Sequence, residues 1–178
     1  GIMWLGLVPL IQVNLPVADV FAGKMAPEAL SVLIFGLVYL TAIVIASRLG
    51  KNIRCTGTAF NEMFSQLSHS FFKRYFIIRA LYLFVYELWF RGFLLFESIK
   101  WFGIPAAISL NIFLYTMLHI FKSKKEILAC IPFGFILCFL SIFFNAAWPA
   151  IILHIGFSLV YEITIYRNYT NSSKTVRS

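Results

Sequence analysis

Two charged residues inside an apolar stretch are the first candidates for chemistry in this sequence. Glu87 and Arg91 lie four residues apart within the run Tyr75–Phe96, which consists mainly of Phe, Leu, Ile and Tyr. In a helix this spacing places both side chains on one face, close enough to pair. An ionisable side chain at bilayer depth is costly, so it faces protein or a water-filled cavity. The pair is either a carboxylate held in a buried polar site or a structural ion pair that fixes the rotation of its helix.

Two histidines in later apolar runs extend the candidate site. His119 follows Tyr115 by one helical turn, and His154 precedes Ser158 by one turn. If Glu87 and both imidazoles converge, one group can deprotonate water while another stabilises the oxyanion formed at a carbonyl. The same trio could instead bind zinc with one open position. A membrane histidine can also serve only as a hydrogen-bonding partner for a neighbouring helix.

The composition sets the class of protein that must position these residues. Of the 178 residues, 61% are hydrophobic and 12% are charged, whereas a soluble domain is about half apolar and about a quarter charged. The sequence therefore predicts an all-α integral membrane protein, a polytopic bundle of transmembrane helices. The net charge of +8 does not indicate nucleic-acid binding, because the basic residues cluster at the ends of apolar runs.

Five apolar runs are long enough to be predicted as membrane spans, since about 20 residues cross a bilayer. These spans are Leu30–Ser47, Tyr75–Phe96, Trp101–Phe121, Ile127–Ala146 and Trp148–Tyr166. Short turns, ESIK at 97–100, KSKKE at 122–126 and NAAWP at 145–149, separate the last four. Residues 1–22 could form a sixth span or an interfacial segment.

We expect residues 1–178 to form a single membrane domain with four parts. The N-terminal helices occupy 1–47, and 48–74 is predicted to be a cytoplasmic segment that includes an amphipathic surface helix. A core of four spans occupies 75–166, and 167–178 is a polar tail expected to be poorly ordered.

The basic residues predict an orientation. Eleven of the 15 Lys and Arg residues fall in segment 48–74, in turn 122–125 and in the tail. These three regions alternate correctly for one side of the membrane, and the positive-inside rule makes that side cytoplasmic. We therefore expect a cytoplasmic C-terminus, most simply in the cytoplasmic membrane of a bacterium.

The other polar residues of the spans suggest no second site. Arg79 lies near the cytoplasmic end of its span and can extend to the interface. Glu162 lies near the same side and could pair with Arg79 or with a lysine. Cys130 and Cys138 are expected to be small buried side chains, since no metal-ligand spacing is present.

The motifs around these residues resemble the CPBP intramembrane proteases, also called the CAAX protease or Abi family. The family's first motif is two glutamates, three variable residues and an arginine, and Tyr86 to Arg91 occupy those positions. An aromatic residue followed four residues later by histidine matches Tyr115 and His119. Histidine followed four residues later by asparagine matches His154, with Ser158 at the asparagine position. The resemblance covers roughly residues 75–166.

Two departures from the family pattern affect the catalytic residues. Tyr86 stands where the family has the glutamate regarded as general base, and tyrosine is a weak base near neutral pH because its ordinary pKa is about 10. Glu87 is the remaining carboxylate, about 100° further round an α-helix. Ser158 has a shorter reach than asparagine but can still donate a hydrogen bond.

The resemblance implies an endopeptidase that hydrolyses a peptide bond of a membrane-associated substrate, a CAAX-like or a leader peptide. Its implied catalytic residues are Glu87 as base, Arg91 as its holder, His119 at the water, and His154 with Ser158 at the oxyanion. No cofactor is required, although zinc on Glu87, His119 and His154 remains open. The alternative is a catalytically silent protein of the same fold, acting as a complex subunit, a scaffold or a bacteriocin self-immunity factor. A transporter is a third class, but the sequence has no evident internal repeat to support it.

Overall fold

The computed structural model describes residues 21, 23, 28–52, 69–120 and 124–175. Within these residues the structure is helical and contains no strand. Its helices are α3 (Ala29–Lys51), α5 (His69–Glu87), the π-helix η1 (Leu88–Leu94), α6 (Leu95–Met117), α7 (Lys124–Phe144) and α8 (Trp148–Thr175). The predicted all-α class is confirmed. Nearly all of 1–22 and all of 53–68 lie outside the described residues, so the possible first span and the amphipathic surface helix stay predictions.

Four helical stretches of the described chain are long and apolar enough to cross a membrane. They are Ala29–Lys51, Lys73–Met117, Glu126–Phe144 and Trp148–Asn168. Large apolar side chains on their outer faces are exposed, as shown on α3 by Leu30, Leu33, Leu37 and Leu40. Such a surface suits lipid and would be costly in water. These helices indicate an integral membrane protein.

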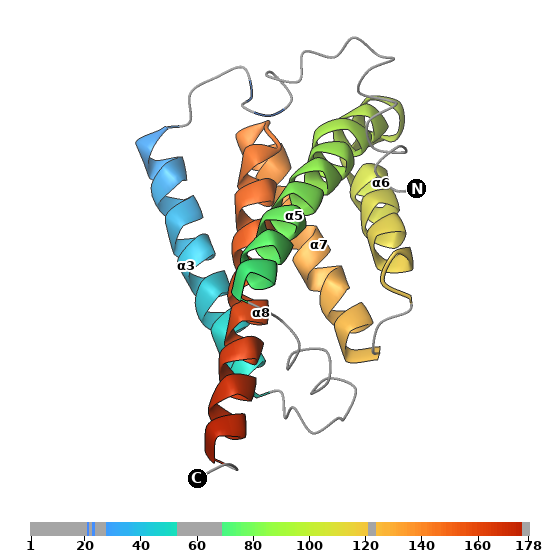
Figure 1. Cartoon of the computed structure of the whole chain (residues 1–178). Helices are drawn as coiled ribbons and strands as arrows, with labels where there is room; N and C mark the ends of the chain where they lie inside the picture. Colours follow the sequence, from blue (N-terminus) through green and yellow to red (C-terminus); the bar gives the residue numbers. More distant parts are fainter. Residues whose placement is uncertain (1–20, 22, 24–27, 53–68, 121–123, 176–178) are drawn as a thin grey trace.

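The longest of the four stretches is divided at Gly103. This residue has φ 76° and ψ 171° inside α6, a backbone conformation that glycine adopts without a steric cost. Pro105 follows, where a proline suits the first turn of a new helical segment. Figure 1 shows the chain rising through α5 and descending through the rest of α6. The turn predicted at 97–100 is therefore wrong: these residues are helical, and the break lies just beyond them.

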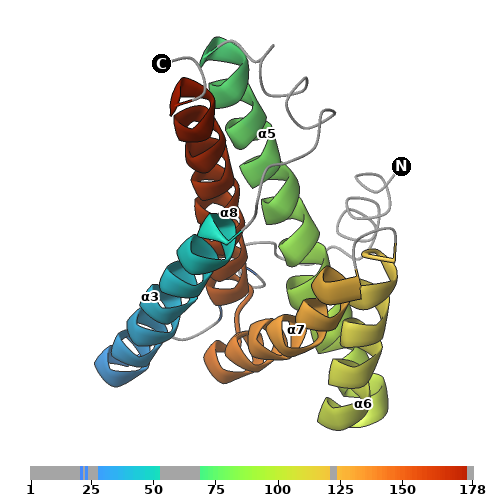
Figure 2. The same ribbon diagram turned by 90° about the horizontal axis from the view of Figure 1, so that it is seen from below.

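Helix α8 lies at the centre of the bundle and packs against α3, α5 and α7, while α6 packs against α7. Figure 2 shows α8 between α3 and α5, with α7 and α6 on the remaining side. A core of buried side chains joins α3, α7 and α8, formed by Phe35, Leu137, Leu140, Ala150 and Leu153. This arrangement makes α8 the rigid support against which the residues of α5 and η1 are placed.

Helix α8 continues to Thr175, so the tail predicted after Arg167 is instead helical over most of its length. Asn168 gives a physical reason. Its Nδ2 donates hydrogen bonds to the backbone oxygens of Gly50 and Lys51, each at 3.2 Å. The last carbonyls of a helix lack partners inside that helix, and Asn168 supplies them to the end of α3. The contact holds the continuation of α8 against α3.

Candidate functional site

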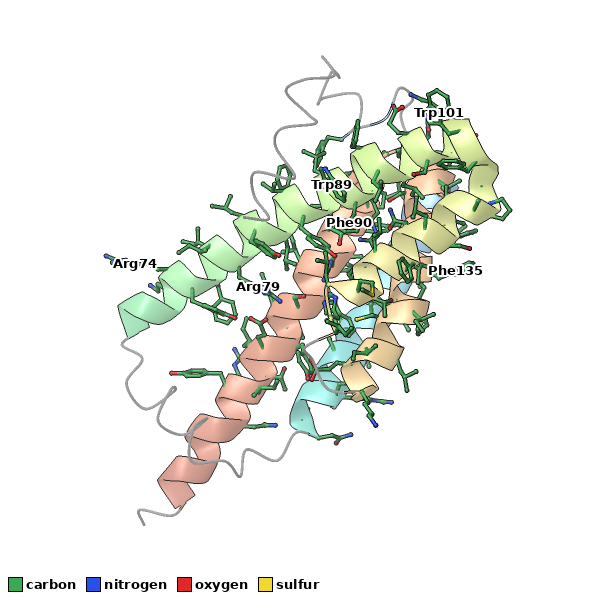
Figure 3. All side chains as sticks on the ribbon, turned by 90° about the vertical axis from the view of Figure 1, so that its right-hand side faces the viewer. Arg74, Arg79, Trp89, Phe90, Trp101 and Phe135 are labelled. Carbon is green, nitrogen blue, oxygen red and sulfur yellow. The ribbon has the colours of Figure 1, made fainter. Side chains whose placement is uncertain are left out.

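The structure brings Glu87, Arg91 and His154 into direct contact. Glu87 Oε1 lies 2.5 Å from His154 Nδ1 and 3.3 Å from Arg91 Nη1, while Glu87 Oε2 lies 3.2 Å from Arg91 Nε. Glu87 ends α5, Arg91 belongs to η1 and His154 belongs to α8, which packs against both. In Figure 3, Trp89 and Phe90 mark the part of η1 that lies between Glu87 and Arg91. The pairing predicted from the four-residue spacing is confirmed.

The side chains of this cluster are buried. The Glu87 and Arg91 side chains are 0% exposed and that of His154 is 8% exposed. A buried charge is stable only when it is paired and hydrogen-bonded, which explains why the carboxylate has two basic partners. The short contact with His154 is typical of a charge-assisted hydrogen bond. With Nδ1 donating to Glu87, Nε2 is the ring nitrogen of His154 that is left for another partner.

The backbone at this position is not an ordinary α-helix. Leu88–Leu94 form a π-helix that begins immediately after Glu87 and contains Arg91. π-helical turns are rare and are frequent at functional sites. The wider turn still leaves Arg91 within reach of Glu87. The turn is also closely packed, because Leu88, Phe90 and Gly92 are buried.

Tyr115 connects His119 to this cluster. Its ring lies 4.7 Å from the His119 ring and 6.2 Å from the His154 ring, and the guanidinium carbon of Arg91 lies 4.7 Å above it. His119 follows the end of α6, and its Nδ1 lies 2.9 Å from the backbone oxygen of Tyr115. This contact assigns the proton to Nδ1 in the neutral ring and leaves Nε2 as an acceptor. His119 is therefore linked to the cluster through Tyr115.

Tyr86 is also part of the site. Its ring stacks on Phe90 at 4.5 Å and meets His154 edge to face at 6.2 Å. Its hydroxyl is buried without a hydrogen-bond partner among the described residues. Ser158 is buried one turn beyond His154 on α8. The Tyr86 ring therefore occupies the space beside His154.

The described residues do not assemble a metal site. No three His, Cys, Asp or Glu side chains in this part of the chain are placed to hold a metal ion. Of the three groups considered for zinc, Glu87 and His154 touch each other, and the contacts of His119 are with Tyr115. The donor set does not fit zinc, and no step of the chemistry is assigned to a metal.

Two residues near the site were missed from the sequence. Asn111 on α6 is fully buried and donates from Nδ2 to the backbone oxygen of Phe90 at 2.7 Å. A Cβ on Gly134 would lie 3.2 Å from Tyr115 Cδ1 and 3.7 Å from Arg91 Nη2. An asparagine inside an apolar span is a usable signal, because polar membrane residues usually have a partner on another helix. Nothing in the sequence distinguishes Gly134 from other helix glycines.

Two expectations for the remaining polar residues are confirmed, the pairing of Glu162 with Arg79 and the burial of two cysteines. Arg79 Nε pairs with Glu162 Oε1 at 3.2 Å, and Figure 3 shows Arg79 on the side of α5 that faces α8. Both side chains are partly exposed, so this pair adds little to stability. Cys130 and Cys138 are buried free thiols. Cys55 lies outside the described residues, as does the side chain of His69.

Comparison with known proteins identifies the family. Residues 68–160, more than half of the chain, match the type II CAAX prenyl endopeptidase Rce1-like family. The chain belongs to this family. The CPBP resemblance read from the motifs is therefore confirmed. No curated protein and no solved structure matches the chain.

Membership in the Rce1-like family carries a general functional implication. Its members are intramembrane glutamyl peptidases, so membership implies an endopeptidase that works on a peptide within the membrane. The matched region includes Glu87, Arg91, His119, His154 and Ser158. The matched range therefore includes every residue that the motifs indicated as a candidate for the site.

Proposed function

We propose that this Rce1-like protein is an active intramembrane endopeptidase that cleaves a membrane-associated CAAX-like or leader peptide. The observation that supports it most is the buried contact of Glu87 with His154 and Arg91. Three ionisable groups from two separate parts of the chain are held together at membrane depth, where each alone would be costly. Such residues mark functional sites more often than structural ones in membrane proteins.

The geometry supports a revised allocation of the catalytic roles. The Glu87 carboxylate is engaged by both Arg91 and His154, so it is not free to contact the attacking water by itself. In our proposal His154 accepts the proton of the attacking water at Nε2, and Glu87 holds its Nδ1 proton and stabilises the imidazolium that forms. A carboxylate plays this part beside histidine in serine proteases. The base is thus the Glu87–His154 pair rather than Glu87 alone.

The other site residues take supporting roles in this proposal. His119 donates its Nδ1 proton to the Tyr115 carbonyl and packs on the Tyr115 ring, so in this proposal it holds Tyr115 beside the cluster. Ser158 donates its hydroxyl proton to the oxyanion that develops on the attacked carbonyl. Arg91 holds the carboxylate of Glu87 through both of its oxygens.

The decisive experiment is cleavage of fluorogenic peptides by the whole protein in proteoliposomes. One peptide series carries a prenylated CAAX-like end and the other an unprenylated leader sequence. We expect Glu87→Gln and His154→Asn each to lower kcat by at least about 10²-fold. Because the two residues act as a unit, the double variant should be no worse than either single variant. Ser109→Ala, an exposed position of α6, is the matched control.

A result that contradicts the proposal is easily recognised. Full cleavage by folded Glu87→Gln would exclude the carboxylate from catalysis. Loss of activity in Glu87→Gln with nearly full activity in His154→Asn would return the base role to Glu87 alone.

A second candidate function is the catalytically silent complex subunit, scaffold or immunity factor. The observation that favours it is Tyr86, which occupies the position of the family's base and packs on Phe90 beside His154. This candidate expects no cleavage by the wild-type protein. It also expects that folded Glu87→Gln and His154→Asn proteins retain partner binding or bacteriocin protection in cells.

We propose that the described part of the chain makes five membrane passages. The break at Gly103 gives the stretch Lys73–Met117 two passages, because 45 residues of continuous helix would be about 68 Å long, twice the bilayer core. The described ends of α3 and α8 and the start of α7 lie toward one end of the bundle (Figure 1). The basic residues at this end support our proposal that it faces the cytoplasm together with the C-terminus.

A further inference from the structure

Among the described residues, Asn111 is a fully buried amide near the site that the proposed chemistry does not use. It lies on α6, 21 residues from Phe90 in the sequence, and its Nδ2 donates to the Phe90 backbone oxygen at 2.7 Å. That oxygen also accepts the backbone N–H of Leu95, the residue that follows η1. Asn111 therefore binds the π-helix at a carbonyl adjacent to Arg91.

The other end of the Asn111 amide is also engaged. The Cys138 thiol of α7 donates to Asn111 Oδ1 at 3.4 Å. Asn111 thus joins the backbone of Phe90, the neighbour of Arg91, to Cys138 of α7. Three helical elements, η1, α6 and α7, meet at this one amide.

A π-turn needs such support, because the hydrogen-bond pattern of the surrounding α-helix would otherwise draw the turn toward α geometry. A change from π to α geometry would rotate Arg91 about the helix axis relative to Glu87, which lies just before the π-turn. The carboxylate would then lose part of its fixed orientation toward His154. Asn111 is well placed to prevent this change, since its partner carbonyl lies in the middle of η1.

We infer that Asn111 is a positioning residue, which holds the π-turn at Phe90 and so keeps Arg91 in place to orient Glu87 toward His154. The catalytic consequence rests on the proposed peptidase function, whereas the geometric consequence does not. A displacement of about 1 Å at a catalytic group can cost about 10²-fold in rate. Loss of Asn111 should therefore lower kcat by about that factor and leave KM unchanged, because no contact with substrate is removed.

The test uses histidine nitrogen resonances, because the chain has only three histidines. The full-length protein is labelled at its histidines, placed in nanodiscs and studied by NMR, with His154→Asn to assign the His154 signals. Glu87→Gln gives the signals of a His154 that has lost its carboxylate partner. We expect Asn111→Leu to move the His154 signals toward that position and to leave the His119 signals in place. Ser109→Ala, on the same helix and away from the site, should leave both unchanged.

The outcomes separate this inference from the proposed function. Wild-type His154 signals in a folded Asn111→Leu protein overturn the positioning role, whether or not any peptide is cleaved. If the Asn111→Leu protein shows shifted signals and the wild-type protein cleaves no peptide, the positioning role is supported and the peptidase proposal is removed. If Asn111→Leu does not fold, Asn111→Ala replaces it under the same criteria. In an active protein, a rise in KM with unchanged kcat would also overturn the inference.

Discussion

The buried charge cluster makes a quantitative prediction at Arg91. The variant Arg91→Met keeps an unbranched side chain and removes the guanidinium, so Glu87 loses its contacts at 3.2 and 3.3 Å. Opposite unit charges at that separation attract by about 5 kcal/mol at an effective dielectric constant of about 20. Removing one partner of a buried pair typically costs about 3–5 kcal/mol, because the other charge stays buried. We expect Arg91→Met to lower the free energy of unfolding by that amount.

The double variant Glu87→Gln/Arg91→Met tests the reasoning behind this number. It removes both charges, so it should be less destabilised than Arg91→Met alone, by about 1–3 kcal/mol of coupling. Denaturant unfolding in mixed micelles, followed by tryptophan fluorescence, gives the free energies. The control is Lys100→Met, which breaks the exposed Glu97–Lys100 pair and should cost less than about 1 kcal/mol.

Two results would refute the argument about the buried cluster. If Arg91→Met is as harmless as Lys100→Met, Glu87 is not a buried charge that depends on Arg91. If the losses of Glu87→Gln and Arg91→Met simply add, the two residues do not interact.

Two further predictions concern packing and topology. A Cβ on Gly156 would lie 2.5 Å from Tyr39 Oη, whereas a Cβ on Gly36 meets nothing within 4 Å. Gly156→Ala should therefore be destabilised by about 1–3 kcal/mol, and Gly36→Ala should be unaffected. Thermal unfolding measures both. Tyr39→Ala should abolish the extra cost of Gly156→Ala, and independent losses would show that the two residues do not meet. Green fluorescent protein fused after Ser178 should fluoresce, because it folds on the cytoplasmic side, and a dark but full-length fusion would reverse the proposed orientation.

The sequence was sufficient for the features that follow from the membrane as a solvent. Long apolar runs predict helices because no other open-chain structure satisfies its backbone hydrogen bonds in lipid. The pairing of Glu87 with Arg91 follows from the helical repeat and from the cost of burying a charge alone. The burial of Cys130 and Cys138 follows from their apolar surroundings. Each of these needs only a local pattern and one physical rule.

The boundaries of elements were less accurate where a local signal competed with a contact between helices. The charged residues at 97–100 resembled a turn, yet the chain breaks at Gly103, where glycine and a nearby proline make the bend easy. The polar residues after Arg167 resembled a disordered tail, yet Asn168 binds the end of α3 and the helix continues. The contact between Asn168 and the end of α3 joins residues more than 100 positions apart in the sequence, so no local pattern can reveal it.

The sequence by itself determined the fold class, the family and the residues that could do chemistry, because these depend on residue types and on spacing along one helix. Only the tertiary structure decided how the residues are connected. It placed His154 on Glu87, set Tyr115 between His119 and the cluster, and revealed Asn111 behind the π-helix. The physical reason is that these contacts depend on the rotation and depth of helices relative to α8. Those quantities are fixed by packing of the whole bundle and not by any segment of it.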